Sequence, residues 1–171
     1  ELGIGTVFNM LGPLTNPAGA ENQLMGVFHP DLVGIQARVL QQLGSRHVMV
    51  VNGCDGLDEI TLSGETRVAE LKHGQVTEFS IRPSQFGMGE CSLDEIKALD
   101  ADNSAAILLS VLENQPGPAR DIVLLNAGAA IYVAGVAHSL ETGIERARDV
   151  LASGAALAKL RQLIEFSQQA A

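Results

Sequence analysis

Three carboxylates concentrated in one short segment are the residues of this chain best suited to chemistry. Residues 52–60 read Asn-Gly-Cys-Asp-Gly-Leu-Asp-Glu-Ile, with carboxylates at Asp55, Asp58 and Glu59. Neighbouring carboxylates repel each other, and Mg²⁺ relieves such repulsion by binding one or two of them and completing its shell with water and phosphate oxygens. The segment is therefore a candidate Mg²⁺ site. The same spacing is also typical of a solvated acidic turn. On spacing alone, the acidic turn is favoured over a metal site.

Asp58 and Glu59 can serve one site only on irregular backbone, because successive side chains of a regular strand point to opposite faces. Gly56 makes such backbone feasible. The preceding residues 47–51, His-Val-Met-Val-Val, predict a strand buried on both faces. Ligands of open α/β sheets bind beyond the carboxyl ends of such strands, so we expect the acidic segment at a ligand-binding edge.

A second candidate is the segment 9–17, Asn-Met-Leu-Gly-Pro-Leu-Thr-Asn-Pro. Its two prolines exclude a helix and predict an ordered, irregular loop. Gly12 would let a planar ligand approach the backbone closely. Alternatively the segment is a rigid connector whose Leu11 and Leu14 fill the core, and this is the better default.

Other familiar chemistries lack their motifs. There is no P-loop and no complete dinucleotide-binding fingerprint, and Ser63 and Ser104 have no nucleophile-elbow context. The four histidines do not pair with each other or with cysteine at metal-ligand spacing, so we assign them no catalytic role. They are His29, His47, His73 and His138.

The elements that position the acidic segment alternate between strand and helix. Residues 24–28 predict a short buried strand, followed by a helix that begins near Pro30 and ends at Gly44. With the strand at 47–51 they form a parallel crossover unit. Residues 66–72 and 75–82 flank His73-Gly74, which predicts a β-hairpin.

From Ser92 onward the pattern is helical. We expect a short helix at Ser92, helices over 103–112 and 120–133, one capped by Ser139, and a final one through Phe166. The helix over 120–133 is nearly all apolar, so we predict that it is central. Residues 1–171 are thus predicted to form a single α/β domain, with a mostly parallel central sheet flanked by helices, a β-hairpin and a helical C-terminal third.

Composition excludes several classes of function. The 171 residues suit one domain, and 46% of them are hydrophobic, enough for a core. Eleven basic against 20 acidic side chains give a net charge of -9, which argues against a nucleic-acid partner. No apolar stretch approaches the roughly 20 residues of a membrane-spanning helix. Cys54 and Cys91 are expected to be reduced thiols of a cytoplasmic protein, and the start at Glu1 suggests a fragment of a longer one.

Five segments, in this order, resemble the anthranilate phosphoribosyltransferase family. The resemblance spans essentially the whole chain but only the carboxyl-terminal, large-domain half of the family, so the family's glycine-rich pyrophosphate loop is absent from these residues. The matching segments are residues 1–3 (Glu-Leu-Gly), 8–17, 55–59, 66–71 (Thr-Arg-Val-Ala-Glu-Leu) and 125–129 (Leu-Asn-Ala-Gly-Ala).

The resemblance implies transfer of the phosphoribosyl group of phosphoribosyl pyrophosphate to the amine of anthranilate, a step of tryptophan biosynthesis. It implies that Asp58 and Glu59 hold Mg²⁺ against the pyrophosphate and that Gly12 and Pro13 line the anthranilate channel. It gives Asn126 no role beyond helix packing. It also implies that the intact enzyme is a homodimer, formed through a helical domain on the amino-terminal side, and that the fragment alone is inactive.

Three alternatives stay open at this stage. One is an enzyme similar to pyrimidine-nucleoside phosphorylases, which would need phosphate and ignore anthranilate. Another is a catalytically silent relative that binds nucleic acid, against which the net charge speaks. The last is an acidic structural domain without a ligand.

Overall fold

The computed structural model describes residues 12–15 and 17–169. The sequence motifs at residues 1–11 and Asn16 lie outside the described residues. In chain order the elements are η1 (Gly12–Leu14), β1 (Asn22–Gly26), α2 (Leu32–Gln42), β2 (His47–Gly53), β3 (Thr66–Lys72), β4 (Gln75–Ile81), η2 (Pro83–Phe86), η3 (Leu93–Glu95), α3 (Ala101–Leu112), α4 (Pro118–Val133), α5 (Leu140–Ala152) and α6 (Ala155–Gln169), where η denotes a 3₁₀ turn.

The four strands of the described residues form one mixed sheet in the order β1-β2-β3-β4. β1 and β2 are parallel, whereas β2–β3 and β3–β4 are antiparallel. The α/β class is confirmed, but the expectation of a mostly parallel sheet is wrong. The reason lies in the connections: a parallel pair needs a long crossover, and only β1 and β2 are joined by a helix. The segment 54–65 simply returns the chain beside β2.

The two local motifs predicted from the sequence are confirmed. β1, α2 and β2 form the parallel crossover, with the first strand two residues earlier than expected. β3 and β4 form the hairpin, in register from Lys72 opposite Gln75 to Thr66 opposite Ile81. Its two-residue turn places His73 at φ 51° and Gly74 at φ 75°, the left-handed pair that a tight hairpin requires.

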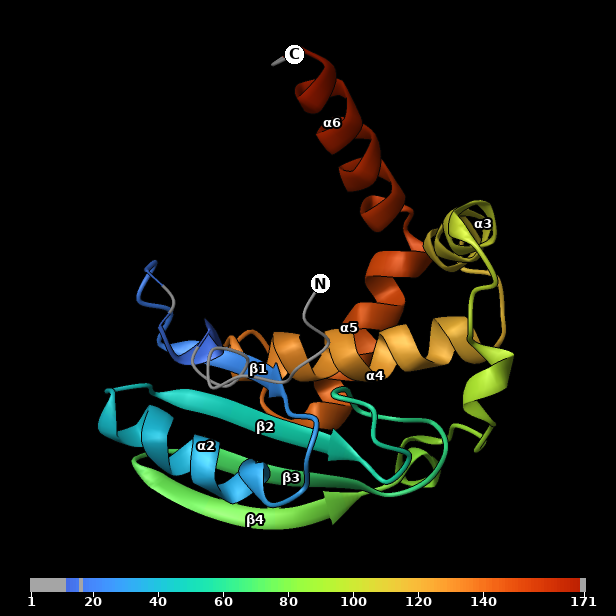
Figure 1. The fold of residues 1–171 in the computed structure, drawn as a ribbon. Coiled ribbons are helices and arrows are strands. Elements are labelled where there is room, and N and C mark those ends of the chain that lie inside the picture. The colour runs from blue at the N-terminus through green and yellow to red at the C-terminus, as the bar shows by residue number, and fades with distance from the viewer. Residues whose placement is uncertain (1–11, 16, 170–171) are drawn as a thin grey trace, which may run out of the picture.

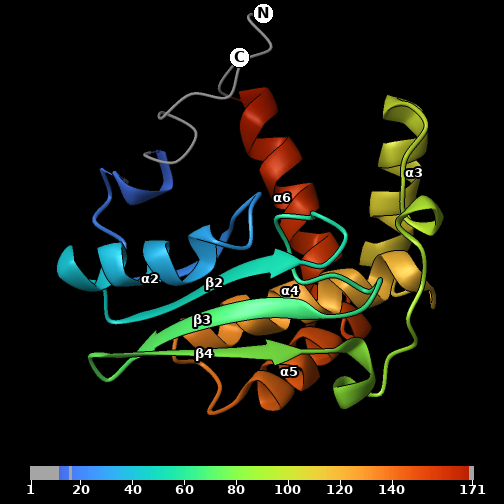
Figure 2. The same cartoon turned by 60° about the horizontal axis from the view of Figure 1, so that its bottom comes forward.

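Helices cover both faces of the sheet (Figures 1 and 2). On one face α2 buries Val33, Ala37 and Leu40 against sheet residues such as Val48 and Val50. On the other face lies α4, with α5 packed against it. As predicted, α4 is central, because its Leu124, Leu125 and Ala129 are fully buried in the larger core. No helix of the described part is long and apolar enough to cross a membrane.

The C-terminal helices begin close to where their capping residues predict. Ser92 and Ser139 both act as N-caps, and the Ser139 hydroxyl accepts a hydrogen bond from the Thr142 amide at 3.3 Å. α3 and α6 lie at one end of α4, and α6 extends away from the sheet (Figure 1). The cysteines, Cys54 and Cys91, are both free thiols.

Two glycines allow α4 and α5 to approach each other closely. A Cβ on Gly128 of α4 would overlap the backbone and side chain of Ile144, and a Cβ on Gly143 of α5 would overlap the Gly128 carbonyl. This contact fixes α4 against α5, and α4 in turn supports the sheet.

We predict that Gly128→Ala destabilises the fold by about 1–3 kcal/mol, because overpacking forces helices apart. Thermal unfolding measures the effect. Gly89→Ala is the matched control, since a Cβ there meets nothing within 4 Å. Equal melting temperatures for the two variants would contradict the described α4–α5 contact.

Candidate functional site

The acidic loop, residues 54–65, leaves the carboxyl end of β2 and returns as β3. It lies beyond the arrowhead of β2, at the edge toward which the parallel strands β1 and β2 both run (Figure 1). Its backbone around Asp58 and Glu59 is neither helix nor strand. This is the irregular conformation that the sequence argument required for two adjacent carboxylates to serve one site.

Asp55 organises the start of the acidic loop. Its Oδ1 accepts a hydrogen bond from the Leu57 amide at 3.1 Å, and its Oδ2 accepts one from the Thr61 hydroxyl at 2.5 Å. The Gly53 amide donates to the Leu57 carbonyl at 2.8 Å, which closes the turn. Asp55 is therefore a structural carboxylate whose oxygens are occupied by the loop itself.

The protonation of Asp55 reflects this role. Burial on its own would raise the pKa of the Asp55 carboxyl, but hydrogen bonds from Thr61, Ser63 and Leu57 outweigh burial and lower the pKa below its ordinary value of 3.8. Asp55 thus stays ionised at neutral pH and keeps the loop folded.

Asp58 and Glu59 are different, because both are solvent exposed and neither forms an ion pair with a described residue. Neighbouring protein atoms still displace enough water to raise the pKa of Glu59, and the negative charge of Asp58 raises it further. The two carboxylates therefore repel each other, and no basic side chain of the described residues forms an ion pair with either. A bound cation would remove that repulsion.

Gly26, the last residue of β1, lies directly against the backbone of Asp58. A Cβ on Gly26 would overlap the Asp58 carbonyl oxygen. Only glycine permits this approach, so the end of β1 packs directly against the backbone of the acidic pair. This contact could not be predicted from the sequence, because no residue near Gly26 indicates which distant backbone segment packs against it.

Asn126 of α4 binds the backbone of Ile60, the residue that directly follows the pair. Its Oδ1 accepts a hydrogen bond from the Ile60 amide at 2.9 Å, and its Nδ2 donates to the Ile60 carbonyl at 2.9 Å and to the Ile122 carbonyl at 3.0 Å. The expectation that Asn126 serves only helix packing is wrong. The available signal was one polar residue within the otherwise apolar run of residues 122–131, because such a residue needs hydrogen-bond partners from elsewhere.

A cavity of about 290 Å³ adjoins the base of the acidic loop. Asn52 and Gly53 at the end of β2 line it, together with Phe28, Glu65 and Arg67. The Asn52 Nδ2 donates to the Val27 carbonyl at 2.7 Å, which ties the segment after β1 to the end of β2. This cavity lies at the same edge of the sheet as Asp58 and Glu59, but neither of these two residues lines it.

Gly12 and Pro13 lie in η1, which precedes β1. Gly12 is exposed, whereas Leu14 of the same turn packs against the core under α2. The predicted packing of Leu14 into the core is confirmed, and Leu11, the other residue of that prediction, lies outside the described residues. Within the described residues, no hydrogen bond joins η1 to the acidic loop. The anthranilate-lining role of Gly12 and Pro13 stays a prediction.

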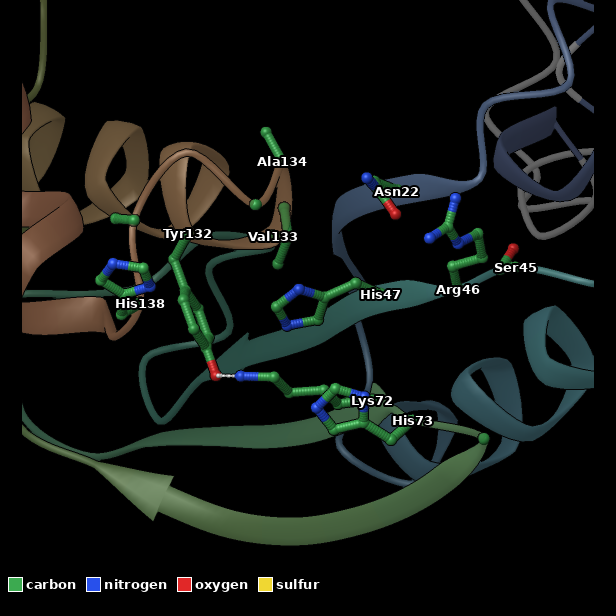
Figure 3. Close-up of a pocket in the computed structure, with 13 residues that line it drawn as sticks. Asn22, Ser45, Arg46, His47, Lys72, His73, Tyr132, Val133, Ala134 and His138 are labelled. Atoms are coloured by element: carbon green, nitrogen blue, oxygen red, sulfur yellow. Dashed lines mark hydrogen bonds between the residues drawn. The ribbon is translucent and has the colours of Figure 1, made fainter.

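A second cavity, of about 690 Å³, lies at the opposite end of the sheet (Figure 3). His47, Lys72 and Tyr132 project toward one another there (Figure 3). Glu70 Oε1 lies 2.8 Å from His47 Nε2 and accepts from the Tyr132 hydroxyl at 2.7 Å, and Lys72 Nζ donates to that hydroxyl at 2.9 Å. The bond to Tyr132 raises the pKa of Lys72. These charges are satisfied within the network, so we place the candidate site at the acidic loop.

The donor set at the acidic loop fits Mg²⁺ better than a transition metal. No group of three or more histidine, cysteine, aspartate or glutamate residues is arranged to hold a metal within the described chain. Two adjacent, unpaired carboxylates are the number that Mg²⁺ commonly takes from a protein when phosphate and water supply the remaining ligands.

Comparison with known proteins decides the family. Residues 1–157 match the model of the glycosyl transferase family, a/b domain. The chain belongs to the glycosyl transferase family. The chain is 66% identical to the anthranilate phosphoribosyltransferase of Laribacter hongkongensis, in an alignment that covers 100% of this chain and 50% of that protein. It is 62% identical to the enzyme of the same name from Nitrosospira multiformis, with 99% of this chain and 49% of that protein covered. The chain thus spans about half the length of these relatives.

Solved structures of family members show the same fold. The chain superposes on anthranilate phosphoribosyltransferase from Thermus thermophilus with a TM-score of 0.87 and 41% identity, covering 96% of this chain and 49% of that one. For the Saccharomyces cerevisiae enzyme in complex with PRPP (phosphoribosyl pyrophosphate) and Mg, the TM-score is 0.83 at 29% identity, with 96% and 48% covered.

We predict that Thr61→Val raises the pKa of Asp55, because valine keeps the shape of threonine but cannot donate to the carboxylate. A lowered pKa means that ionised Asp55 stabilises the loop above its unfolded pKa, and that this stability is lost as the pH falls through the folded pKa. The carboxyl-carbon NMR titration should therefore have its midpoint below 3.8 in the wild type and higher in Thr61→Val.

Thr77→Val, on the exposed strand β4, is the matched control and should leave the Asp55 midpoint unchanged. An unchanged midpoint in Thr61→Val as well would show that the Thr61 hydroxyl does not hold Asp55.

Proposed function

We propose that this chain is the carboxyl-terminal, large-domain portion of a cytoplasmic anthranilate phosphoribosyltransferase. The intact protein, meaning the full-length polypeptide that contains this chain, would transfer the phosphoribosyl group of phosphoribosyl pyrophosphate to the amine of anthranilate. The observation that carries the proposal is the pair Asp58 and Glu59, exposed and free of ion pairs within the described chain, at the carboxyl edge of β2. The 66% identity to an anthranilate phosphoribosyltransferase supports the choice of substrates.

Asp58 and Glu59 are the residues that would hold Mg²⁺. Bound there, the ion supplies positive charge that stabilises the negative charge developing on the departing pyrophosphate. The yeast relative has been solved in complex with PRPP and Mg, and separately in complex with 4-fluoroanthranilate. Both complexes support this choice of ligands for the intact protein.

The remaining residues of the chain would act by positioning. Asp55 and Thr61 keep the acidic loop folded, and Gly26 lets the loop lie close to β1. We propose that Gly12 and Pro13 line the side of the pocket that receives anthranilate. Fixing the amine and the ribose carbon in one orientation accounts for much of the acceleration of such a transfer, so no protein nucleophile is required.

The rest of the intact protein would complete the pocket. Because the chain covers 50% of its relative from Laribacter hongkongensis, we propose that the pyrophosphate-binding and dimer-forming segments belong to the other half. The chain alone would then bind one side of each substrate and turn over neither.

We predict that the double variant Asp58→Asn/Glu59→Gln of the intact protein loses about 100-fold or more in kcat, since the charge on the leaving group is no longer stabilised. Its rate should also rise much less with Mg²⁺ concentration. Anthranilate consumption, followed by fluorescence across a magnesium titration, measures both quantities.

The control for this variant is Glu145→Gln/Asp149→Asn, which removes two exposed carboxylates of α5 and the same amount of charge. It should behave as the wild type. A magnesium titration of Asp58→Asn/Glu59→Gln that matches this control would refute the metal assignment. Phosphate-dependent cleavage of a nucleoside, without anthranilate turnover, would instead support the phosphorylase alternative.

We also predict that residues 1–171 alone convert no measurable anthranilate under conditions in which the intact protein is active. The same fluorescence assay, on equal molar amounts of both proteins, checks this. Turnover by the chain alone would show that the pocket does not need the other half.

A further inference from the structure

Asn126 is a partly buried polar side chain near the middle of α4, within a run of apolar residues. Leu124 and Leu125, directly before it, are 0% exposed. An amide in such a position is costly unless hydrogen bonds replace those it makes with water. Asn126 meets this condition with three bonds, two of them to a single residue of the acidic loop, Ile60.

The two bonds to Ile60 occupy both of its backbone polar groups. One Asn126 side chain satisfies both the N–H and the C=O of Ile60, each at 2.9 Å, as a neighbouring strand would. The Ile60 side chain is 1% exposed and belongs to the same core as Leu124 and Leu125. Residue 60 therefore can neither rotate nor shift without breaking contacts to α4.

The acidic pair is thus held between two backbone anchors. Asp58 lies with its carbonyl against Gly26 of β1, and Ile60, directly after Glu59, is bound by Asn126 of α4. The backbone of the pair is fixed from both sides, whereas its side chains stay exposed. A fixed backbone under exposed, mutually repelling carboxylates is what a preorganised cation site requires.

We propose that Asn126 is a positioning residue that keeps the Glu59 carboxylate beside that of Asp58, within reach of one divalent cation. Without the anchor, like-charge repulsion drives the two carboxylates apart into solvent, and a cation must then restore their arrangement at the expense of its own binding energy. The inference rests on the proposed function: the effect on cation binding needs only the proposed cation site at Asp58 and Glu59, whereas the effect on turnover also needs the proposed phosphoribosyl transfer.

The competing explanation is that Asn126 only joins α4 to the loop. Removing it would then lower stability and leave the cation affinity unchanged. The two explanations separate if cation binding is measured directly, apart from turnover.

The test uses Asn126→Ala in the intact protein, with Mn²⁺ as a paramagnetic substitute for Mg²⁺. Electron paramagnetic resonance gives the Mn²⁺ dissociation constant, and hydrogen exchange gives the protection of the Ile60 amide. We expect an about tenfold weaker Mn²⁺ affinity, as is typical when a residue that orients metal ligands is removed. We also expect faster exchange at Ile60 and a higher Mg²⁺ concentration for half-maximal rate.

Two further variants keep the test decisive. Tyr132→Phe is the matched control, because it removes the side-chain hydrogen bonds to Glu70 and Lys72 near the carboxyl end of α4. It should leave the Mn²⁺ affinity and the exchange of the Ile60 amide unchanged. Asn126→Gln keeps an amide but displaces it by one methylene, so it should fold even if Asn126→Ala does not. It should weaken Mn²⁺ binding in the same direction.

The outcomes distinguish the inference from the proposed function. The positioning role is overturned if Asn126→Gln binds Mn²⁺ as tightly as the wild type. The same result in Asn126→Ala, provided that this variant folds, also overturns it, whatever stability the variant has lost. Mn²⁺ binding by the wild type that does not depend on Asp58 and Glu59 overturns it as well. Weakened Mn²⁺ binding in an intact protein that ignores anthranilate supports the positioning role and refutes the proposed function.

Discussion

Repulsion between two adjacent carboxylates is the constraint that explains the arrangement of this site. Asp58 and Glu59 carry like charges without a described basic partner, and this repulsion contributes to the raised pKa of Glu59. Left to itself, a flexible loop would separate them. The fold prevents this with bonds that lie entirely outside the pair: Asp55 closes the turn before it, and Asn126 binds the backbone after it. The hydrogen bonds of Asp55 and Asn126 thus keep the two carboxylates together despite their mutual repulsion.

The central helix α4 connects this loop to the rest of the molecule. Its apolar residues fill the core beneath the sheet, and its close contact with α5 through Gly128 fixes its position. Near its middle Asn126 holds the acidic loop, and near its carboxyl end Tyr132 joins the network of Glu70 and Lys72. A displacement of α4 would therefore shift the acidic loop and change the positions of the two carboxylates. Through Asn126 and Tyr132, α4 is thus hydrogen-bonded to both the acidic loop and β3.

The sequence predicted what depends on local patterns. Apolar spacing and caps such as Ser139 located the helices, and the pair His73-Gly74 located the hairpin turn. Strand pairing was predicted less well, because the direction in which β3 pairs with β2 depends on residues far apart in the chain. The expectation of a mostly parallel sheet generalised from the single crossover β1–α2–β2, and the segment 54–65, which has no helix, was not recognised as an antiparallel return.

The same distinction applies to the site. The chemical type of Asp58 and Glu59 and their place after a buried strand were visible in the sequence, whereas their supports were not. Gly26 lies 32 positions before Asp58, and Asn126 lies 66 positions after Ile60, so neither contact leaves a local trace. Only the unexplained polarity of Asn126 in its apolar helix pointed to a partner.

The most direct test of the account is the location of a divalent cation in the intact protein. Anomalous diffraction from crystals grown with Mn²⁺ and pyrophosphate would reveal it without reference to kinetics. We expect one strong peak in contact with carboxylate oxygens of both Asp58 and Glu59, with the Asn126–Ile60 bonds in place. A peak held by other residues, with these two carboxylates turned away from it, would contradict the account.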